Sequence, residues 1–386
     1  MLEAIEWARA VVLGVDSPHL GLEELRCRLD DGREVPAVAY TQLTGRLAPG
    51  QAVWLNTRAL SLNLGTGGVA FVIAPAGADP PPTRPDGRET APADRPPGGG
   101  PAQDSGFLVK ARYTPLQVAV RGVDSPGSPH HDALQRAESL ELMPVVVADL
   151  HSSLPAICAA IRHDAANAAA PRAPRLVYVM TDGAALPIAF SRCVARLTGQ
   201  GVIAATVTAG QAFGGDYEAV SVHSALLTAR HVAGADIAVC VQGPGNLGSD
   251  TPWGFSGVAV GDAVNAVAAL GGRPIGCLRV SGADPRARHR GLSHHSLTAY
   301  GKVALAAADL ALPLFDGELA AFGQAVAQAA RPLAARHRLH RVPLDGLMGA
   351  LEAFGGLPTM GRGLADDPAA FLAAAAAGRL AHSLAV

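Results

Sequence analysis

The clearest pattern along the chain is an apolar run, then a turn rich in Gly, Ser or Asp, then an Ala-rich stretch of helical length. It occurs five times, with the strand-like runs MPVVVADL, RLVYVMTD, GVIAATVTAG, ADIAVCVQ and PIGCLRVSG. These runs are apolar on both faces, as expected of parallel strands covered by helices on both sides. The alternation predicts a doubly wound, Rossmann-like α/β domain with a mostly parallel sheet over residues 106–386. The stretch FGQAVAQAARPLAARHRLHRV predicts a helical C-terminal extension packed on that sheet.

Residues 1–74 show a different pattern, with shorter strand-like runs. LRCRLD and REVPAVAY flank Asp31-Gly32, a pair that favours a β-hairpin because glycine tolerates positive φ. ARAVVLGV, QAVWLN and VAFVIA supply three further strands. Five short strands predict a small SH3-like or OB-like β-barrel, which we interpret as a packing or docking module.

The segment between these two regions, residues 75–105, has nine Pro and five Gly and no Leu, Ile, Val or aromatic residue. Such a composition buries too little apolar surface to offset the entropy lost on ordering. We therefore expect a disordered linker there.

Composition narrows the class of protein. The 386 residues are 49% hydrophobic and 17% charged, with a net charge of −2, which provides no field for attracting nucleic acid or anionic membranes. No apolar run approaches the roughly 20 residues of a membrane span, and the N-terminus carries acidic residues where a signal peptide is basic. The five cysteines are scattered, without a C-x-x-C pair, as is typical of a reducing compartment. We expect a cytoplasmic protein that binds neither nucleic acid nor a membrane.

Candidate chemistry gathers where the predicted strands end, the edge at which open α/β sheets bind ligands. Asp149 and His151 follow the first strand, Asp182 follows the second, and His295 follows the last. We interpret these four residues as candidate catalytic acids and bases. The alternative is structural: Asp149 ends a strand before a serine-capped helix, and Asp182 is a turn residue.

The last of these loops, ADPRARHRGLSHHSLTAYG, is rich in histidine and arginine. Arg279 and Arg286 are candidates for binding an anionic group, because guanidinium matches carboxylate and phosphate bidentately. A divalent metal is a candidate cofactor, with Asp149, His151 and His294 as ligands. Neighbouring histidines in an extended segment point to opposite sides, so we expect at most one of the pair at 294–295 to reach a shared site. A solvated basic loop is the alternative.

Two glycine-rich turns complete this edge. Gly214 and Gly215 precede Asp216 and a predicted helix beginning with YEAVSVHSALL, so their amides are candidates for binding an anion. The competing and favoured interpretation makes Asp216 the N-cap of that helix.

The sequence VQGPGNLG contains G-x-G-x-x-G after a strand. No helix pattern opens at its third glycine, no acid ends a strand about 20 residues later, and Pro244 removes an amide, so we do not interpret it as a dinucleotide fingerprint. Gly243 and Gly245 instead predict a tight turn that forms one wall of a site.

Several longer motifs resemble a bacterial family known only as domain-of-unknown-function family 3866. They are VKARYTPLQ, VVVADLHSSLP, VMTDGAALP, TAGQAFGGDYEAVSVHSALL, GPGNLG with GFSG, ADPRARHRGLSHHSLTAYG and TMGRG. The similarity extends over nearly the whole chain except the linker. It implies a shared fold and carries no activity, substrate or catalytic residue.

Three hypotheses for function follow. The first is an enzyme of hydrolase or transferase type that acts on a small anionic substrate at the carboxyl edge of the sheet, with or without the help of a metal ion. The second is a non-catalytic regulatory protein that binds a nucleotide or phosphometabolite there. The third is an oligomeric scaffold, because the Ala-rich tail DPAAFLAAAAAGRLAH is suited to packing on another subunit in a homo-oligomer.

Overall fold

The computed structural model describes residues 7–16, 19, 21–57, 60, 68–77, 107–110, 118–168 and 173–385. Its contacts divide the chain into two compact units, Met1–Ser105 with Ala111–Val118 and Gly106–Lys110 with Ala119–Val386. The expected disordered linker falls, beyond residue 77, outside the described residues. The two units are described separately below.

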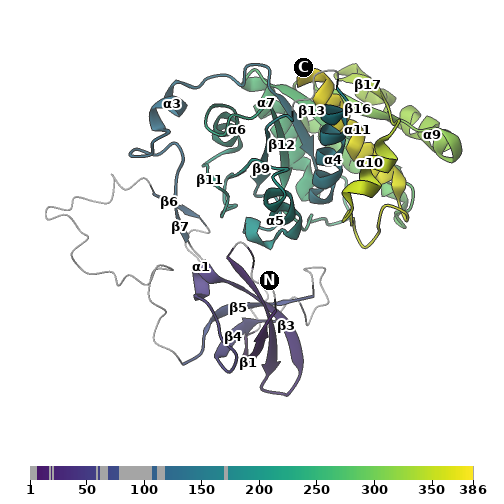
Figure 1. The fold of residues 1–386 in the computed structure, drawn as a ribbon. Helices are drawn as coiled ribbons and strands as arrows, with labels where there is room; N and C mark the ends of the chain where they lie inside the picture. Colours follow the sequence, from purple (N-terminus) through teal and green to yellow (C-terminus); the bar gives the residue numbers. More distant parts are fainter. Residues whose placement is uncertain are drawn as a thin grey trace. The chain divides into compact units, whose positions relative to one another are not determined.

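The first unit is a closed five-stranded barrel with the strand order β1-β2-β3-β5-β4 (Figure 1). Side chains alternate between a buried interior and an exposed exterior, which is why short alternating runs predicted these strands. The β2–β3 hairpin forms around Asp31-Gly32 as expected, with Gly32 at a φ of 87°. The elements are β1 Trp7–Val15, β2 Leu22–Leu29, β3 Glu34–Tyr40, α1 Thr41–Thr44, β4 Ala52–Asn56 and β5 Ala70–Pro75.

The second unit contains an eight-stranded sheet with the order β11-β10-β9-β12-β8-β13-β16-β17, in which every pairing is parallel. The predicted α/β class with a parallel sheet is confirmed. Its strands are β8 Pro144–Ala148, β9 Leu176–Thr181, β10 Ala205–Thr208, β11 Tyr217–Glu218, β12 Ile237–Gln242, β13 Arg273–Cys277, β16 Asp309–Leu314 and β17 Arg338–Pro343. Two small pairs lie outside it, namely β6 Phe107–Lys110 with β7 Val118–Arg121 and β14 Val280–Ser281 with β15 Gly291–Leu292.

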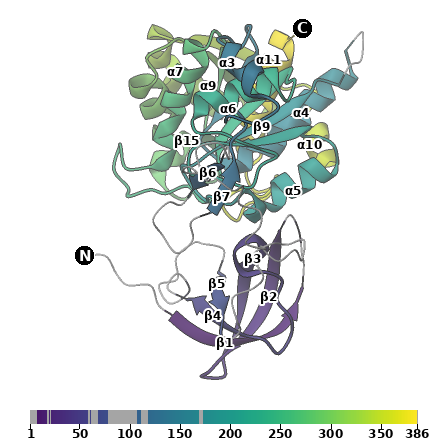
Figure 2. The ribbon, with the colours of Figure 1, turned by 90° about the vertical axis from the view of Figure 1, so that its left-hand side faces the viewer.

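Helices cover both faces of this sheet (Figures 1 and 2). On one face α4, α10 and α11 pack against Val146 and Ala148 of β8, and on the other α6 and α7 pack against Val145 and Val147. The helices are α3 His131–Arg136, α4 Leu154–Ala166, α5 Arg192–Gly199, α6 Val222–His231, α7 Val260–Ala269, α8 His294–Thr298, α9 Ala320–Ala330, α10 Leu347–Phe354 and α11 Pro368–Ala385. Among the described residues, no helix has the length and apolarity needed to cross a membrane.

The position of β8 in the strand order makes it the switch point of the sheet. From β8 the chain crosses to β9 through α4 on one face, and it later reaches β13 through α7 on the other face. The loops after the neighbouring strands β8 and β12 therefore leave the sheet toward opposite faces. Open α/β sheets bind ligands at such a switch point.

The Ala-rich tail forms α11, which is buried within its own chain. Residues 373–377 are at most 3% exposed, and the helix lies against α4 so closely that a Cβ at Gly378 would come within 2.3 Å of the Ile157 carbonyl oxygen. This surface is therefore already covered, which removes the observation on which the scaffold hypothesis depended.

Three elements differ from the prediction. Strand β17, residues 338–343, lies almost wholly within the stretch 322–342 that was expected to be helical, and strand β16, residues 309–314, was not predicted. The helix expected from Asp216 begins instead at Val222, with Ser221 as its N-cap in a capping box. Asp216 accepts hydrogen bonds from the backbone and hydroxyl of Thr206, which places it at the edge of the sheet.

Candidate metal and anion site

The site begins with three residues at the carboxyl ends of adjacent strands. Gln242 ends β12, Asp149 follows β8, and Arg279 lies two residues beyond β13. The side-chain amide of Gln242 donates to the backbone oxygen of Asp149 at 2.8 Å, which fixes the loop after β8. The Asp149 side chain contacts residue 257, where a Cβ would lie 2.8 Å from the Asp149 Cβ, so this position requires glycine.

The Asp149 carboxylate is buried and bound on two sides. Its Oδ2 lies 3.3 Å from Nη1 of Arg279 and 3.1 Å from Nδ1 of His295. Burial works against ionisation of Asp149, but the Arg279 charge and the His295 contact outweigh it and keep the pKa of the carboxyl below its ordinary value. Asp149 is therefore a carboxylate at neutral pH.

Three histidines lie together beside this carboxylate. His289 ends a 3₁₀ turn at 287–289, while His294 and His295 begin α8. One ring nitrogen from each lies within 4.8 Å of those of the other two. The expectation that at most one residue of the pair reaches a shared site is wrong, because the pair begins a helix, where successive side chains are not on opposite sides. Their ring centroids are 4.6 Å apart.

In two of these rings, His289 and His295, the Nδ1 atom contacts another side chain. Nδ1 of His289 lies 2.7 Å from the hydroxyl of Ser293, the N-cap of α8, and Nδ1 of His295 faces Asp149. Metal-binding histidines are typically oriented in this way by a hydroxyl, carbonyl or carboxylate. Nη1 of Arg279, which can only donate, also lies 2.9 Å from Nδ1 of His295. Nε2 of His295 is free to bind a metal only in the tautomer in which Nδ1 carries the proton and donates to Asp149.

The remaining features suit metal binding. Nε2 of His294 is buried and, among the described residues, has no hydrogen-bond partner. Burial, followed by the charges of Arg279 and Arg286, lowers the pKa of His289 to about 3, and burial with neighbouring His295 lowers the pKa of His294. Neutral imidazole is the form that coordinates metals. The ring of Phe255 stacks on His295 at a centroid distance of 3.6 Å and covers one side of the cluster.

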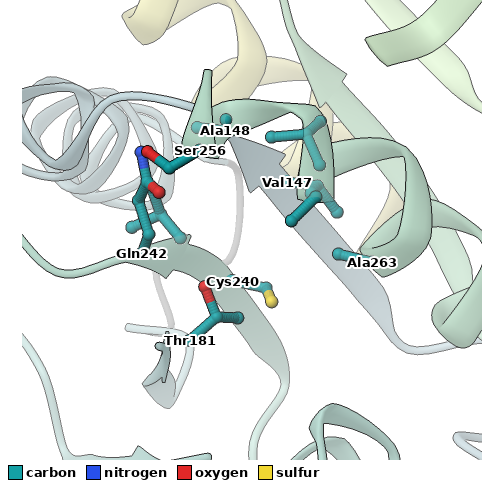
Figure 3. Close-up of a pocket in the computed structure, with 11 residues that line it drawn as sticks. Val147, Ala148, Thr181, Cys240, Gln242, Ser256 and Ala263 are labelled. Carbon is teal, nitrogen blue, oxygen red and sulfur yellow. The ribbon is translucent and has the colours of Figure 1, made fainter. Parts of the chain in front are cut away.

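A small pocket with a cavity volume of about 10 Å³, room for about one water molecule, lies between the ends of β8 and β12 and helix α7. Its lining includes Gly257, which contacts Asp149, so the pocket adjoins the carboxylate. Within the described part of the chain, Oε1 of Gln242 is buried there without a donor. Figure 3 shows the residues around this space, among them Gln242, Ser256, Thr181, Cys240, Val147 and Ala263.

His151, predicted as a catalytic residue and a metal ligand, lies in a different set of contacts. Its Nε2 lies 2.6 Å from the hydroxyl of Ser191, and its Nδ1 lies 3.2 Å from the Tyr178 hydroxyl and from the Gln242 carbonyl oxygen. Burial lowers the pKa of His151 to about 4. None of its described contacts is with Asp149 or the histidine cluster.

Asp182, the other predicted catalytic acid, holds the loop after β10. Its Oδ2 accepts a hydrogen bond from the backbone of Gln211 at 2.9 Å, and it lies against Gly210, whose φ is 63°. The structure therefore brings together Asp149 and His295 of the predicted catalytic set, and places His151 and Asp182 elsewhere along the same edge.

The predicted anion-binding glycines differ in what surrounds them. The amides of Gly214 and Gly215 donate to Glu218 and Thr208 within the protein. A Cβ at Gly243 would lie 2.4 Å from a backbone oxygen in the loop after β9, whereas Gly245, with a φ of 93°, faces open space. No helix opens at the third glycine of this loop; the next helical turn begins at Ser256.

The two predicted arginines both lie at this site. Arg279 joins Asp149 to His295, as described above, and Arg286 binds Asp284 through Nε and Nη2, each at 2.9 Å. Sequence reasoning assigned no role to Ser293 or Phe255. The Ser-His-His order contains the signal for the first, since a serine before a short helix is a strong N-cap that fixes where both histidine rings emerge.

The sequence matches one known protein family. Residues 36–378 match the model of a family described as "Protein of unknown function (DUF3866)". The chain belongs to this family. The matched range in this DUF3866 protein contains the whole histidine cluster, Asp149, Arg279 and the complete parallel sheet. Neither the curated proteins nor the solved structures gave a match to the chain.

Proposed function

We propose that this protein is a metal-assisted enzyme of hydrolase or transferase type that acts on a small anionic substrate at the carboxyl edge of its parallel sheet. The metal is a divalent ion held by His289, His294 and His295. In a four-coordinate site, three histidine ligands leave the fourth position for water or substrate. Catalytic zinc sites have this arrangement, whereas structural zinc sites have four protein ligands. The ion supplies Lewis acidity there.

One observation carries this proposal: Nε2 of His294 is buried without a described partner inside a cluster of three imidazoles. A buried nitrogen left without a hydrogen bond costs about 1–3 kcal/mol, and a bound cation removes that cost. The contacts of Ser293 with His289 and of Asp149 with His295 support the same interpretation, because each orients a ring whose other nitrogen is then available.

Arg279 gives the site its preference for an anion. Arg279 is 8% exposed, and its guanidinium lies next to both Asp149 and His295, so it places a positive charge beside the proposed metal ligands. The five cysteines are free, and we propose a reducing compartment, the cytoplasm, as the location of the protein.

The proposal is tested by metal analysis of the full-length protein purified without a histidine tag. We expect close to one transition-metal ion per chain in the wild type and at least tenfold less in His294→Ala. The matched control is His223→Ala, because His223 is an exposed histidine on α6, away from the cluster. Loss of metal from both variants, or from neither, would contradict the site.

Catalysis is tested separately with the metal-loaded protein and a panel of phosphate esters, carboxylate esters and amides. We expect turnover that depends on metal and is lost in His294→Ala. Stabilisation of the protein by nucleotides or phosphosugars without turnover would instead support the non-catalytic binding hypothesis.

A further inference from the structure

Two guanidinium groups at the site converge on one uncharged atom. Nη2 of Arg279 lies 3.6 Å from the sulfur of Met360, and Nη2 of Arg286 lies 3.5 Å from the same sulfur. A thioether is a weak hydrogen-bond acceptor. The two positively charged guanidinium groups therefore share a contact with an uncharged sulfur and not with a carboxylate.

Each guanidinium is held in place by other contacts, so the convergence is built into the site. Arg279 is positioned by Asp149 and His295 through Nη1, and Arg286 is positioned by the buried carboxylate of Asp284. In the described part of the chain, the sulfur is the only acceptor that contacts Nη2 of Arg279. Nη2 of Arg286 donates one N–H to Asp284, so its second N–H, together with Nη2 of Arg279, is what remains for a ligand.

Met360 itself is poorly suited to its position. Its side chain is 53% exposed, and its φ is 49°, a left-handed conformation that favours glycine over a residue with a side chain. It lies in a tight turn closed by two backbone hydrogen bonds between Thr359 and Arg362, of 2.8 and 2.9 Å. An exposed side chain on such a turn can leave without unpacking the core, and strained residues concentrate at ligand sites.

We propose that Arg279 and Arg286 form a subsite for an oxyanion, the carboxylate or phosphate group of a small substrate, and that this anion takes the place of the Met360 thioether. Planar guanidinium groups bind both kinds of oxyanion through paired N–H groups. Since Arg279 contacts His295, the subsite places the substrate's charged group beside the histidine cluster. The inference rests on the proposed function for its catalytic meaning, but anion binding itself needs no metal.

The experiment uses the full chain freed of metal with EDTA, titrated calorimetrically with inorganic phosphate and, in parallel, with acetate. We expect at least one of these anions to bind the wild type, and its affinity to fall at least tenfold in Arg286→Gln. Arg341→Gln is the matched control, since it removes the same charge from an exposed position on β17. Met360→Gly should bind the anion several-fold more tightly, because no sulfur must be displaced and glycine accepts the positive φ.

Binding of phosphate alone would identify a phosphorylated substrate, and binding of acetate alone a carboxylate. No binding of either anion, or equal affinities in Arg286→Gln and Arg341→Gln, would overturn the subsite. An unchanged affinity in Met360→Gly would overturn the displacement. Thermal unfolding of each variant separates loss of binding from loss of folding. If the anion binds but metal analysis finds no metal, the proposed function fails while the subsite stands.

Discussion

Asp149→Asn isolates the buried charge on which the geometry of the site depends. The variant keeps the size of the side chain but leaves the Arg279 guanidinium, 8% exposed, without its carboxylate partner. Removing one partner of a buried ion pair costs about 3–5 kcal/mol. We therefore expect Asp149→Asn to lower the free energy of unfolding by about 3–5 kcal/mol, measured by urea denaturation at pH 7.

Asp182→Asn is the matched control. It makes the same chemical change at an exposed carboxylate that accepts a hydrogen bond from a backbone amide, so we expect a loss of about 1 kcal/mol. Adding Arg279→Met to Asp149→Asn should recover part of the lost stability, because the unpaired charge is then removed as well. A loss for Asp149→Asn no larger than that for Asp182→Asn, or no recovery in the double variant, would refute the reasoning.

Three further predictions concern folding. Gly257→Ala places a Cβ 2.8 Å from that of Asp149, and we expect a loss of about 1–3 kcal/mol in urea unfolding; an unchanged stability would contradict the close contact. Asp309 is fully buried, and although burial opposes ionisation, its arginine and histidine partners hold its pKa well below the ordinary value. The carboxylate therefore stabilises the fold above its unfolded pKa of about 4 and loses this effect as pH falls. In urea unfolding, the wild type should be more stable than Asp309→Asn at pH 7, and this difference in stability should narrow below about pH 4. A difference that does not change with pH would contradict this. Lys110→Met leaves the Glu218 carboxylate, 2.7 Å from Nζ in the wild type, without its buried cation, and should cost about 3–5 kcal/mol; Lys110→Met with Glu218→Gln should cost less than Lys110→Met alone.

The continuous apolar runs allowed strands β8, β9, β10, β12 and β13 to be predicted, because central parallel strands are buried on both faces. Strand β17 lies at the edge of the sheet, where RLHRVP is only partly buried, and its mixed polarity resembled a helix. Strand β16 is apolar after its first residue, Asp309, but it follows an Ala-rich segment with no turn signal between them. The local sequence pattern thus predicts the central strands of the sheet, but it does not predict strands β16 and β17 at one edge.

The sequence predicted at which edge of the sheet the candidate residues lie. It predicted less well which of these residues contact one another. Placement at the strand ends identified Asp149, Arg279 and His295, because parallel strands deliver their loops to one edge. The partner of His151 could not be found this way: Ser191 is the N-cap of α5, 40 residues later, and contacts the imidazole only through the packing of that helix. The pair at 294–295 was misjudged because its local conformation is helical rather than extended.

The central claim, a metal ion bound by three histidines, is tested most directly by anomalous diffraction from crystals of the untagged full-length protein grown with zinc and measured at the zinc absorption edge. We expect one strong peak within about 2.0–2.1 Å of a ring nitrogen of each of His289, His294 and His295. A map without a peak there, or with zinc bound elsewhere, such as at the exposed His223, would contradict it.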